Sequence, residues 1–125
     1  MIRRLGLLGL TVLAACSGPP PGPVGGEVTL ALQSPNIDDG AVLIRIVGPI
    51  TEITPSGDYL VSSAPLGTTA TKIVVVGNLA SGPLIRVYVP DLNLLSTYTV
   101  FVEQAASRTD FVLYDPSGYS IIIVR

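Results

Sequence analysis

Apolar and polar side chains alternate over most of the chain beyond residue 26. In the segment 28–33 every second residue (Val28, Leu30, Leu32) is a large aliphatic one, and the same period of two recurs in 42–46 and 98–102. Such alternation is typical of half-buried β-strands, whose successive side chains point to opposite faces of a sheet. Clusters of Pro, Gly, Asp, Asn and Ser separate the runs, and no stretch shows helical spacing over three turns. We predict seven to nine short strands, with candidate positions near residues 27–33, 41–47, 50–54, 58–63, 71–77, 84–89, 97–105, 110–114 and 119–124.

Two runs lack the alternation. Residues 72–76 and 119–124 are almost unbroken stretches of Ile and Val. Strands that are buried on both faces read as continuous apolar runs. We therefore expect both segments to be central strands, covered on either side.

The number and spacing of the strands predict the fold class. Strands at intervals of 8–12 residues, separated by turns, are typical of a single antiparallel β-sandwich. The segment 27–125, roughly 99 residues, is long enough for one hydrophobic core without disulfides or metals. In layout it resembles the immunoglobulin-like and cohesin-like sandwiches of exported bacterial proteins. This likeness is one of architecture alone, because the Cys…Trp…Cys signature of antibody-type domains is absent: the chain has one Cys and no Trp.

The first sixteen residues have a different pattern. A basic start with Arg3 and Arg4 precedes the uncharged run 5–14. That run is shorter than the ~20 residues of a transmembrane helix and has the length of a signal-peptide core. The run ends in Leu13-Ala14-Ala15-Cys16, which resembles the lipobox of bacterial lipoproteins at all four positions. The alternative is a free thiol in an ordinary signal peptide or membrane anchor.

The resemblance to lipoproteins implies a specific modification. In that family the cysteine thiol accepts diacylglycerol, residues 1–15 are removed, and the new amine is open to acylation with palmitate or a similar chain. Cys16 is thus the expected lipidation site and the first residue of the mature protein. It is the only cysteine, so no disulfide forms within the chain. Ser17, in place of Asp, implies the outer membrane if the host has two membranes.

A Pro/Gly-rich segment follows the expected lipidation site. Residues 17–26 contain four prolines and four glycines. An extended polyproline form rises about 3.1 Å per residue, so this segment could hold the domain roughly 30 Å from a membrane. We interpret residues 16–26 as a tether, although a Pro-rich segment is also able to bind aromatic grooves.

Composition excludes some partners. Hydrophobic residues make up 48% of the chain and charged residues 13%, against about 25% charged in typical soluble domains. Beyond residue 16, five basic residues stand against nine acidic ones, a formal charge of −4. An acidic, weakly charged surface is a poor match for phosphate backbones, so we expect no nucleic acid partner.

The residue types that usually carry chemistry are scarce. The chain has no histidine, and its one cysteine is assigned to lipid. No Gly-x-Ser-x-Gly, Ser-x-x-Lys or Gly-x-x-x-x-Gly-Lys motif occurs. We therefore predict a protein that is not an enzyme, with no catalytic residues and no cofactor.

Carboxylates are the remaining candidates for a site. Asp38 and Asp39 precede Gly40 and could offer oxygen ligands to calcium, although Asp-Asp-Gly is first of all a turn sequence. Asp110 and Asp115 could pair as acid and base for glycoside hydrolysis; surface turn carboxylates are the alternative.

Five tyrosines offer a second kind of site, because tyrosines in a row on an exposed sheet face form a binding platform. Tyr98 shares a face with Val100 and Val102 and is expected in the core. Tyr59, Tyr88 and Tyr114 are the candidates for exposure; structural tyrosines scattered through a sandwich are the alternative.

These observations lead to two functional hypotheses. The first is a non-enzymatic interaction or structural module of the cell envelope, held to the membrane by its lipid and bound to an envelope protein. The second is a small glycan- or solute-binding domain that uses calcium or works without it. A hydrolytic enzyme has little support, because the usual catalytic groups are missing.

Overall fold

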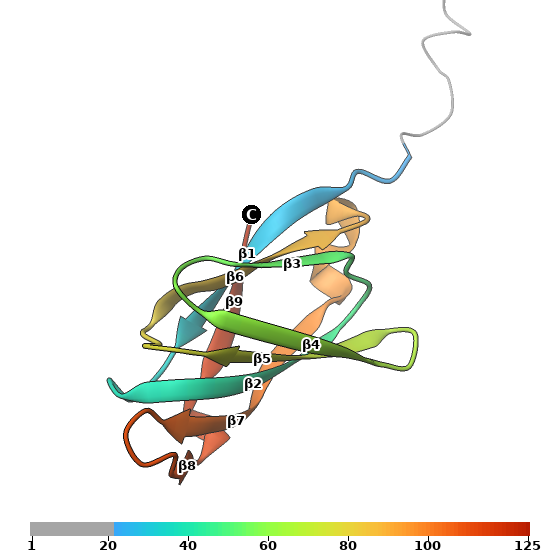
Figure 1. The fold of residues 1–125 in the computed structure, drawn as a ribbon. Helices are drawn as coiled ribbons and strands as arrows, with labels where there is room; N and C mark the ends of the chain where they lie inside the picture. The colour runs from blue at the N-terminus through green and yellow to red at the C-terminus, as the bar shows by residue number, and fades with distance from the viewer. Residues whose placement is uncertain (1–21) are drawn as a thin grey trace, which may run out of the picture.

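The computed structural model describes residues 22–125; the lipobox, Cys16 and the first part of the expected tether lie outside the described residues. Nine strands and two short 3₁₀ helices follow one another in this part (Figure 1). Their bounds are β1 Gly26–Gln33, β2 Asp39–Val47, β3 Glu52–Pro55, β4 Leu60–Leu66, β5 Ala70–Val76, β6 Gly82–Val89, η1 Leu92–Thr97, β7 Thr99–Ser107, β8 Leu113–Tyr114, η2 Pro116–Gly118 and β9 Ser120–Val124.

The strands form two antiparallel sheets that pack face to face (Figure 1). The four-stranded sheet has the order β3-β6-β1-β9, and the five-stranded sheet has the order β4-β5-β2-β7-β8. The predicted all-β fold with a single antiparallel sandwich is confirmed. All nine candidate strands are present, most of them within two residues of the expected bounds.

The period of two explains why these strands bury one face. Val28, Leu30 and Leu32 of β1 are at most 3% exposed, and the residues between them face outward. On β2 the inward set is Val42, Ile44 and Ile46. The inward faces of both sheets meet in one core, because each sheet can remove its apolar side chains from water only against the other.

The two unbroken apolar runs are not doubly covered strands, and this prediction was wrong. β5 lies between β4 and β2, but Val74 and Val76 are exposed on its outer side. β9 lies at an edge, where it pairs with β1 alone. Within residues 22–125, no segment covers the outer face of either sheet. A run of β-branched residues in these strands therefore reflects the preference of such residues for strand conformation and does not indicate burial on both faces.

Two further boundaries differ from the prediction. The segment 92–97 forms η1, whose first turn is capped by the Asp91 carboxylate accepting from the Asn93 N–H at 3.0 Å. β8 has only two residues, because the preceding loop reaches Val112 before pairing with β7 begins. Short 3₁₀ turns leave no helical apolar period in a sequence.

We call the end of the sandwich where the described chain begins the tether end, after the predicted tether, and the opposite end the distal end. Near the N-terminus of the described chain, the Leu92 N–H donates to the Val24 carbonyl at 2.7 Å, so the last residues of the expected tether contact η1. The loops 34–38, 77–81 and 108–112 lie at the opposite, distal end (Figure 1). In residues 22–125 no helix has the length and apolar character needed to span a bilayer.

Candidate functional site

The outer face of the five-stranded sheet is unusually apolar. The register of β2 with β5 and β7 places every second residue of each strand on this face. Six large apolar residues on it are exposed: Val47, Leu60, Val74, Val76, Phe101 and Leu113. We call this surface the apolar face. The core lies on the other side of the sheet, so these side chains do not take part in its packing.

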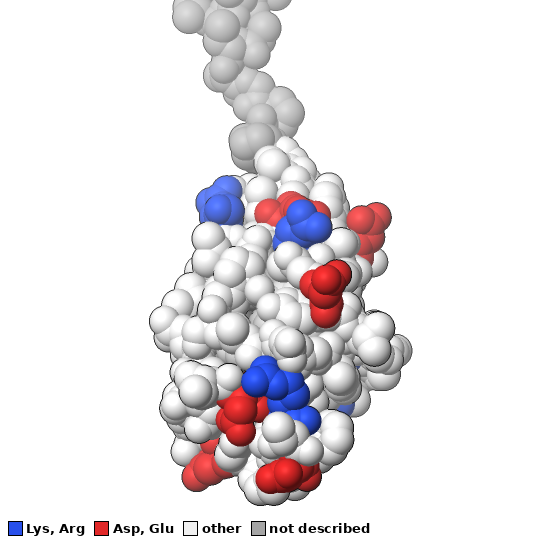
Figure 2. All heavy atoms as spheres, turned by 60° about the vertical axis from the view of Figure 1, so that its left-hand side comes forward, with Lys and Arg blue, Asp and Glu red and all other residues white. Residues whose placement is uncertain are grey.

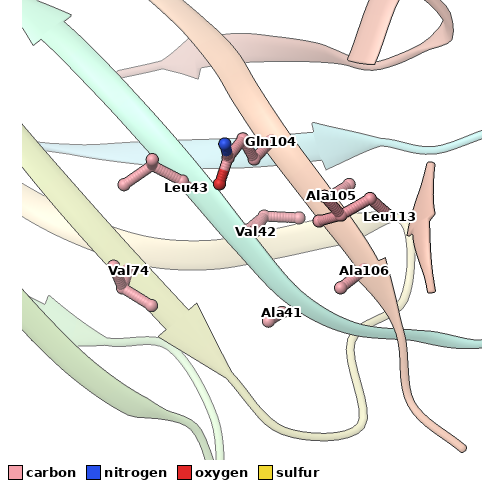
Figure 3. A pocket seen from close by; sticks show the side chains of 8 residues that line it. All are labelled: Ala41, Val42, Leu43, Val74, Gln104, Ala105, Ala106 and Leu113. Carbon is pink, nitrogen blue, oxygen red and sulfur yellow. The ribbon is translucent and has the colours of Figure 1, made fainter. Parts of the chain in front are cut away.

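A shallow groove runs along the distal half of the apolar face. Its volume is about 150 Å³, and side chains from β5, β2, β7 and β8 surround it (Figure 3). Leu43 and Val74 come from two neighbouring strands, where they are paired in register, and Leu113 borders the groove from β8. Gln104 supplies the one polar side chain of the lining. The lining residues are Ala41, Val42, Leu43, Val74, Gln104, Ala105, Ala106 and Leu113.

The loop between β7 and β8 extends this apolar surface. Phe111 is 69% exposed and has a backbone φ of +53°, a left-handed conformation that bulky residues rarely adopt. Ser107 closes the loop: its N–H donates to the Val112 carbonyl at 2.9 Å, and its hydroxyl accepts from the Val112 N–H at 3.0 Å. These hydrogen bonds fix the loop in a conformation that keeps the Phe111 ring exposed to solvent. A strained, exposed aromatic residue is typical of a binding surface and not of a hydrophobic core.

A second cleft lies beside the same loop. Its volume is about 230 Å³, and Phe111 and Arg108 line it together with Gly40, Val76, Gly77 and Asn78. Val76 lies next to Val74 on the apolar face of β5, separated by one residue. The cleft therefore borders the distal end of the groove. Phe111 lines this cleft and is at the same time exposed to solvent.

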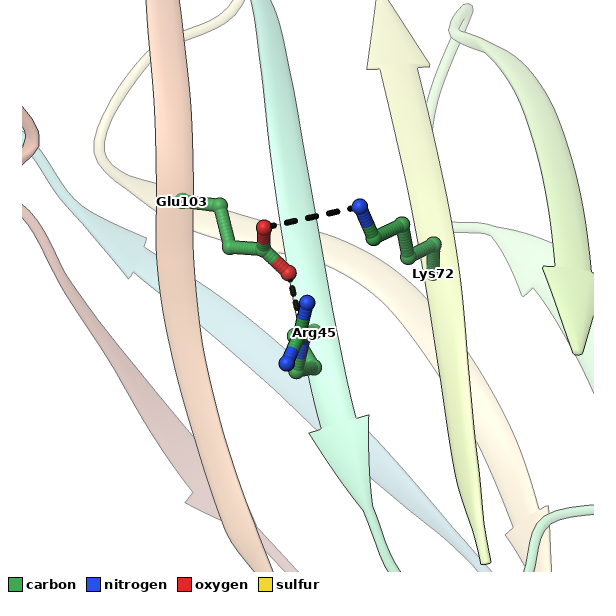
Figure 4. A network of polar contacts seen from close by, with 3 residues as sticks. All are labelled: Arg45, Lys72 and Glu103. Carbon is green, nitrogen blue, oxygen red and sulfur yellow. Dashed lines mark hydrogen bonds and ion pairs between the residues drawn. The ribbon is translucent and has the colours of Figure 1, made fainter. Parts of the chain in front are cut away.

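Three charged residues bound the groove on the side of the tether end. Glu103 accepts from Arg45 Nε at 2.5 Å and lies 3.6 Å from Lys72 Nζ (Figure 4). The Arg45 guanidinium lies 5.9 Å from the centre of the Phe101 ring, within range of a cation–π contact. Glu103 is thus shared by two cations, and this group carries a net charge of +1 beside the uncharged apolar part of the face.

The surface as a whole has few charged side chains. Figure 2 shows one face on which charged residues gather in two groups, with a broad uncharged band between them. This distribution agrees with the low charged fraction of 13%.

The two calcium candidates are hydrogen-bonded within the protein. Asp39 is fully buried and accepts from the Tyr119 hydroxyl at 2.6 Å and from the Ser34 hydroxyl. Asp38 accepts from the Tyr114 hydroxyl, which lies 2.8 Å from both of its carboxylate oxygens. Within residues 22–125, no group of three or more acidic, His or Cys side chains could hold a metal ion. Asp38 lies in the connection between β1 and β2, as the turn interpretation predicts, whereas Asp39 and Gly40 are the first residues of β2, so for them that interpretation was wrong.

These contacts also shift tyrosine pKa values. The hydrogen bond to Asp38 is the main cause that raises the pKa of Tyr114 to about 12, because ionising the hydroxyl would break that bond beside a negative charge. Burial, followed by the hydrogen bond to Asp39, raises the pKa of Tyr119. Both hydroxyls therefore remain protonated at neutral pH. Their hydrogen bonds connect Tyr114 to Asp38 and Tyr119 to Asp39 at the distal end of the sandwich.

Asp110 and Asp115 do not resemble an acid–base pair. The Asp115 carboxylate accepts from the Ser117 N–H at 3.0 Å and caps η2. That backbone hydrogen bond lowers the pKa of Asp115, whereas a general acid for glycoside hydrolysis needs a raised pKa. Both residues are exposed, as expected of surface turn carboxylates.

The tyrosines do not form a platform. Tyr88 is exposed on the four-stranded sheet, as predicted. Tyr98 packs against the core, also as predicted, and its hydroxyl donates to the Pro49 carbonyl at 2.5 Å. Tyr59 and Tyr114, the other two candidates for exposure, are half-buried against the core, which agrees with the alternative of structural tyrosines scattered through the sandwich. Cross-strand packing and the contact with Asp38 account for this burial.

No protein family, curated protein or solved structure matches the chain. The candidate site therefore rests on geometry: the apolar face, its groove and Phe111. Sequence reasoning did not identify it, although one signal was present. Phe111, Val112 and Leu113 form an apolar triplet beside a turn, and an exposed loop is one reason for such a run.

Proposed function

We propose that this chain is a non-enzymatic lipoprotein of the bacterial cell envelope, anchored through Cys16, whose β-sandwich binds a protein partner with its apolar face. The observation that carries the proposal is the apolar surface around the groove. It is formed by the exposed Val74 and Leu113 with the half-buried Leu43, and the exposed Phe111 extends it. Exposed apolar patches of this kind mark protein interaction sites. The anchor is supported by the match of residues 13–16 to the lipobox.

The size and lining of the groove favour a protein partner over a glycan or small solute. Its volume of about 150 Å³ lies below the roughly 300–1,000 Å³ of small-molecule pockets. It suits one or two apolar anchor side chains, which contribute most of the affinity in protein interfaces. Among residues 22–125 a glycan would meet one exposed tyrosine, Tyr88, on the opposite sheet.

The anchor is tested by mass spectrometry and fractionation of the full chain. We expect the mature N-terminus to be a diacylglyceryl-modified Cys16, and the protein to sediment with membranes. The variant Cys16→Ser should lose the lipid and leave the membrane fraction. If that variant stays with the membranes to the same extent, the proposed anchor is wrong.

The binding face is tested by photo-crosslinking in intact cells. A photoreactive residue in place of Leu113, which is 67% exposed at the groove, should yield a defined adduct. The matched control is Leu94, which is 52% exposed on η1 at the tether end and should yield little. The substitution Leu43→Asp should abolish the adduct at position 113. Equal yields at positions 113 and 94 would contradict the proposed face.

The alternative of a glycan-binding domain that uses calcium is tested by thermal unfolding. Calcium bound at 100 times its dissociation constant stabilises a protein by about 2.7 kcal/mol. Under our proposal the melting temperature of the full chain is the same in calcium and in EDTA. A rise in calcium would favour the alternative instead.

A further inference from the structure

Three of the four sheet edges carry features that prevent pairing with another strand. β3 has only four residues, including Glu52 and Pro55, and β4 contains Pro65. β8 has two residues. Charged residues, proline and short length are the usual protection of a sheet edge, because an unpaired edge offers a row of free backbone donors and acceptors.

The fourth edge, β9, has none of this protection. Its five residues are Ser120, Ile121, Ile122, Ile123 and Val124, with no charge, proline or glycine. They pair with β1 in unbroken register, without a bulge. In residues 22–125 no strand pairs with the other side of β9. The strand is therefore straight enough and apolar enough to accept a neighbour.

The side chains of β9 are only partly covered. Ile121 and Ile123 point inward and are half-buried, as are the inward Ile53 of β3 and Val61 of β4 at two other sheet edges. Ile122 and Val124 point outward and are 43% and 47% exposed. A further strand beside β9 would cover all four side chains from one side.

We propose that the free edge of β9 pairs antiparallel with β9 of a second copy of this chain, which joins two four-stranded sheets into one. Antiparallel pairing of a strand with itself is symmetric, so one edge serves both copies. With Ile122 at the two-fold axis all five residues are paired: Ile122 lies opposite its own counterpart, Ile121 opposite Ile123, and Ser120 opposite Val124. β-branched side chains are then opposite each other at the three central pairs, which Ile121, Ile122 and Ile123 form.

The charges at the two ends of the strand favour the same partner. Arg125 follows β9 directly, and Asp115 lies in the connection just before it. Antiparallel pairing brings Arg125 of each copy to the end of the strand where the other copy carries Asp115. A second copy therefore supplies opposite charges at both ends.

The geometry also constrains how tethered copies would meet. Antiparallel pairing directs the two N-terminal segments away from opposite ends of the pair. If the proposed tether is correct, the paired copies lie with their strands along the membrane surface. The pairing itself requires neither the lipid nor the apolar face, so its test is independent of the proposed function.

Disulfide trapping in the full chain tests the proposal. In the variant Ile122→Cys the two thiols lie directly opposite each other across the axis, with Cβ atoms about 4.5–5.5 Å apart. Mild oxidation should give a product of twice the chain mass on a non-reducing gel. The matched control is Val124→Cys on the same strand and face. Its counterpart lies four residues away along the strand, roughly 14 Å, beyond disulfide reach. We expect about tenfold more dimer from Ile122→Cys than from Val124→Cys.

A second set of variants tests the register and the edge. Ser120→Cys combined with Val124→Cys should restore the dimer, because these positions lie opposite each other. Adding Ile122→Lys should remove it, because two like charges would then meet at the axis. Unchanged thermal unfolding would show that each variant is folded, and the parent chain with Cys16 alone measures the background.

Each outcome decides the proposal. Trapping at position 122, restoration in the double variant and loss with Ile122→Lys support it. Equal or absent trapping in folded Ile122→Cys and Val124→Cys variants would overturn it. A cross-linked product of another mass would make β9 an edge for a different protein and overturn the assignment to a second copy.

Discussion

The two outer faces of the sandwich differ in character although the inner faces match. The outer face of the four-stranded sheet carries Glu27, Thr29 and Arg86, with Glu27 and Arg86 at 4.0 Å. On the five-stranded sheet the outward residues include Leu43 and Val74, and a groove lies between them and β8. Both sheets bury aliphatic side chains inward in the same way.

This difference distinguishes the residues that stabilise the fold from those that we propose bind a partner. A sheet with one polar and one apolar face is the usual solution for a sandwich in water. The four-stranded sheet approaches it at Glu27, Thr29 and Arg86, although Tyr88 on β6 and Ile122 and Val124 on β9 are exposed on the same outer face. The five-stranded sheet departs from it at positions that contribute nothing to the core. The departure therefore needs another explanation, and a partner that covers the face provides one.

The largest expected effect tests whether the inner faces are equivalent. Leu30→Ala on the four-stranded sheet and Ile44→Ala on the five-stranded sheet should each lower the free energy of unfolding by about 2–5 kcal/mol, because each removes a fully buried side chain. Leu43→Ala, one position away on the apolar face, should cost less than about 1 kcal/mol. Chemical denaturation measures all three. A large loss from Leu43→Ala would make the apolar face structural.

A somewhat smaller effect is expected at the distal end. Asp39→Ala should lower the free energy of unfolding by about 2 kcal/mol, because the buried Tyr119 hydroxyl loses its acceptor. Tyr119→Phe with Asp39→Ala should destabilise less than the sum of the two single changes, since the pair is lost only once. Strict additivity in denaturation experiments would show that the two groups do not interact.

The pH dependence of stability should reveal Tyr114. Its pKa is about 12 in the folded protein, against 10.0 ordinarily, so the folded state holds this proton more tightly. The associated stability is fully present below pH 10 and is lost as the pH rises toward about 12. Tyr114→Phe should flatten this fall, measured as denaturation midpoints across that range. The fall should persist in part, because the pKa values of Tyr98 and Tyr119 are raised too. An identical slope in both proteins would contradict the assignment.

The smallest effect is expected at the charged border of the groove. Glu103→Gln should change the free energy of unfolding by less than about 1 kcal/mol, because its pairs with Arg45 and Lys72 are partly exposed. The same change should alter the salt dependence of partner binding. Salt-independent binding in the parent and the variant would place the charges outside the interface.

Much of the fold was predictable because its causes are local. Alternation at Val28, Leu30 and Leu32 identifies both a strand and its inward face, and turn residues identify where strands end. The interpretation of Asp-Asp-Gly as a turn followed from the same kind of reasoning and was wrong for Asp39, which begins β2 and is buried. The candidate site was not predictable in this way. Leu43, Val74 and Leu113 are far apart in the chain, and they meet only because β5, β2, β7 and β8 are neighbours.

Local sequence patterns predict the strands, their inward faces and the single-sandwich fold, because a period of two and turn chemistry act over a few residues. The sequence also carries the lipobox resemblance at Cys16, which lies outside the described residues. Tertiary structure alone decided the order of strands within each sheet. That order makes 119–124 an edge rather than a centre, buries Asp39 under Tyr119, and assembles the apolar face. Strand order depends on contacts between residues distant in sequence, and no local pattern encodes which strands become neighbours.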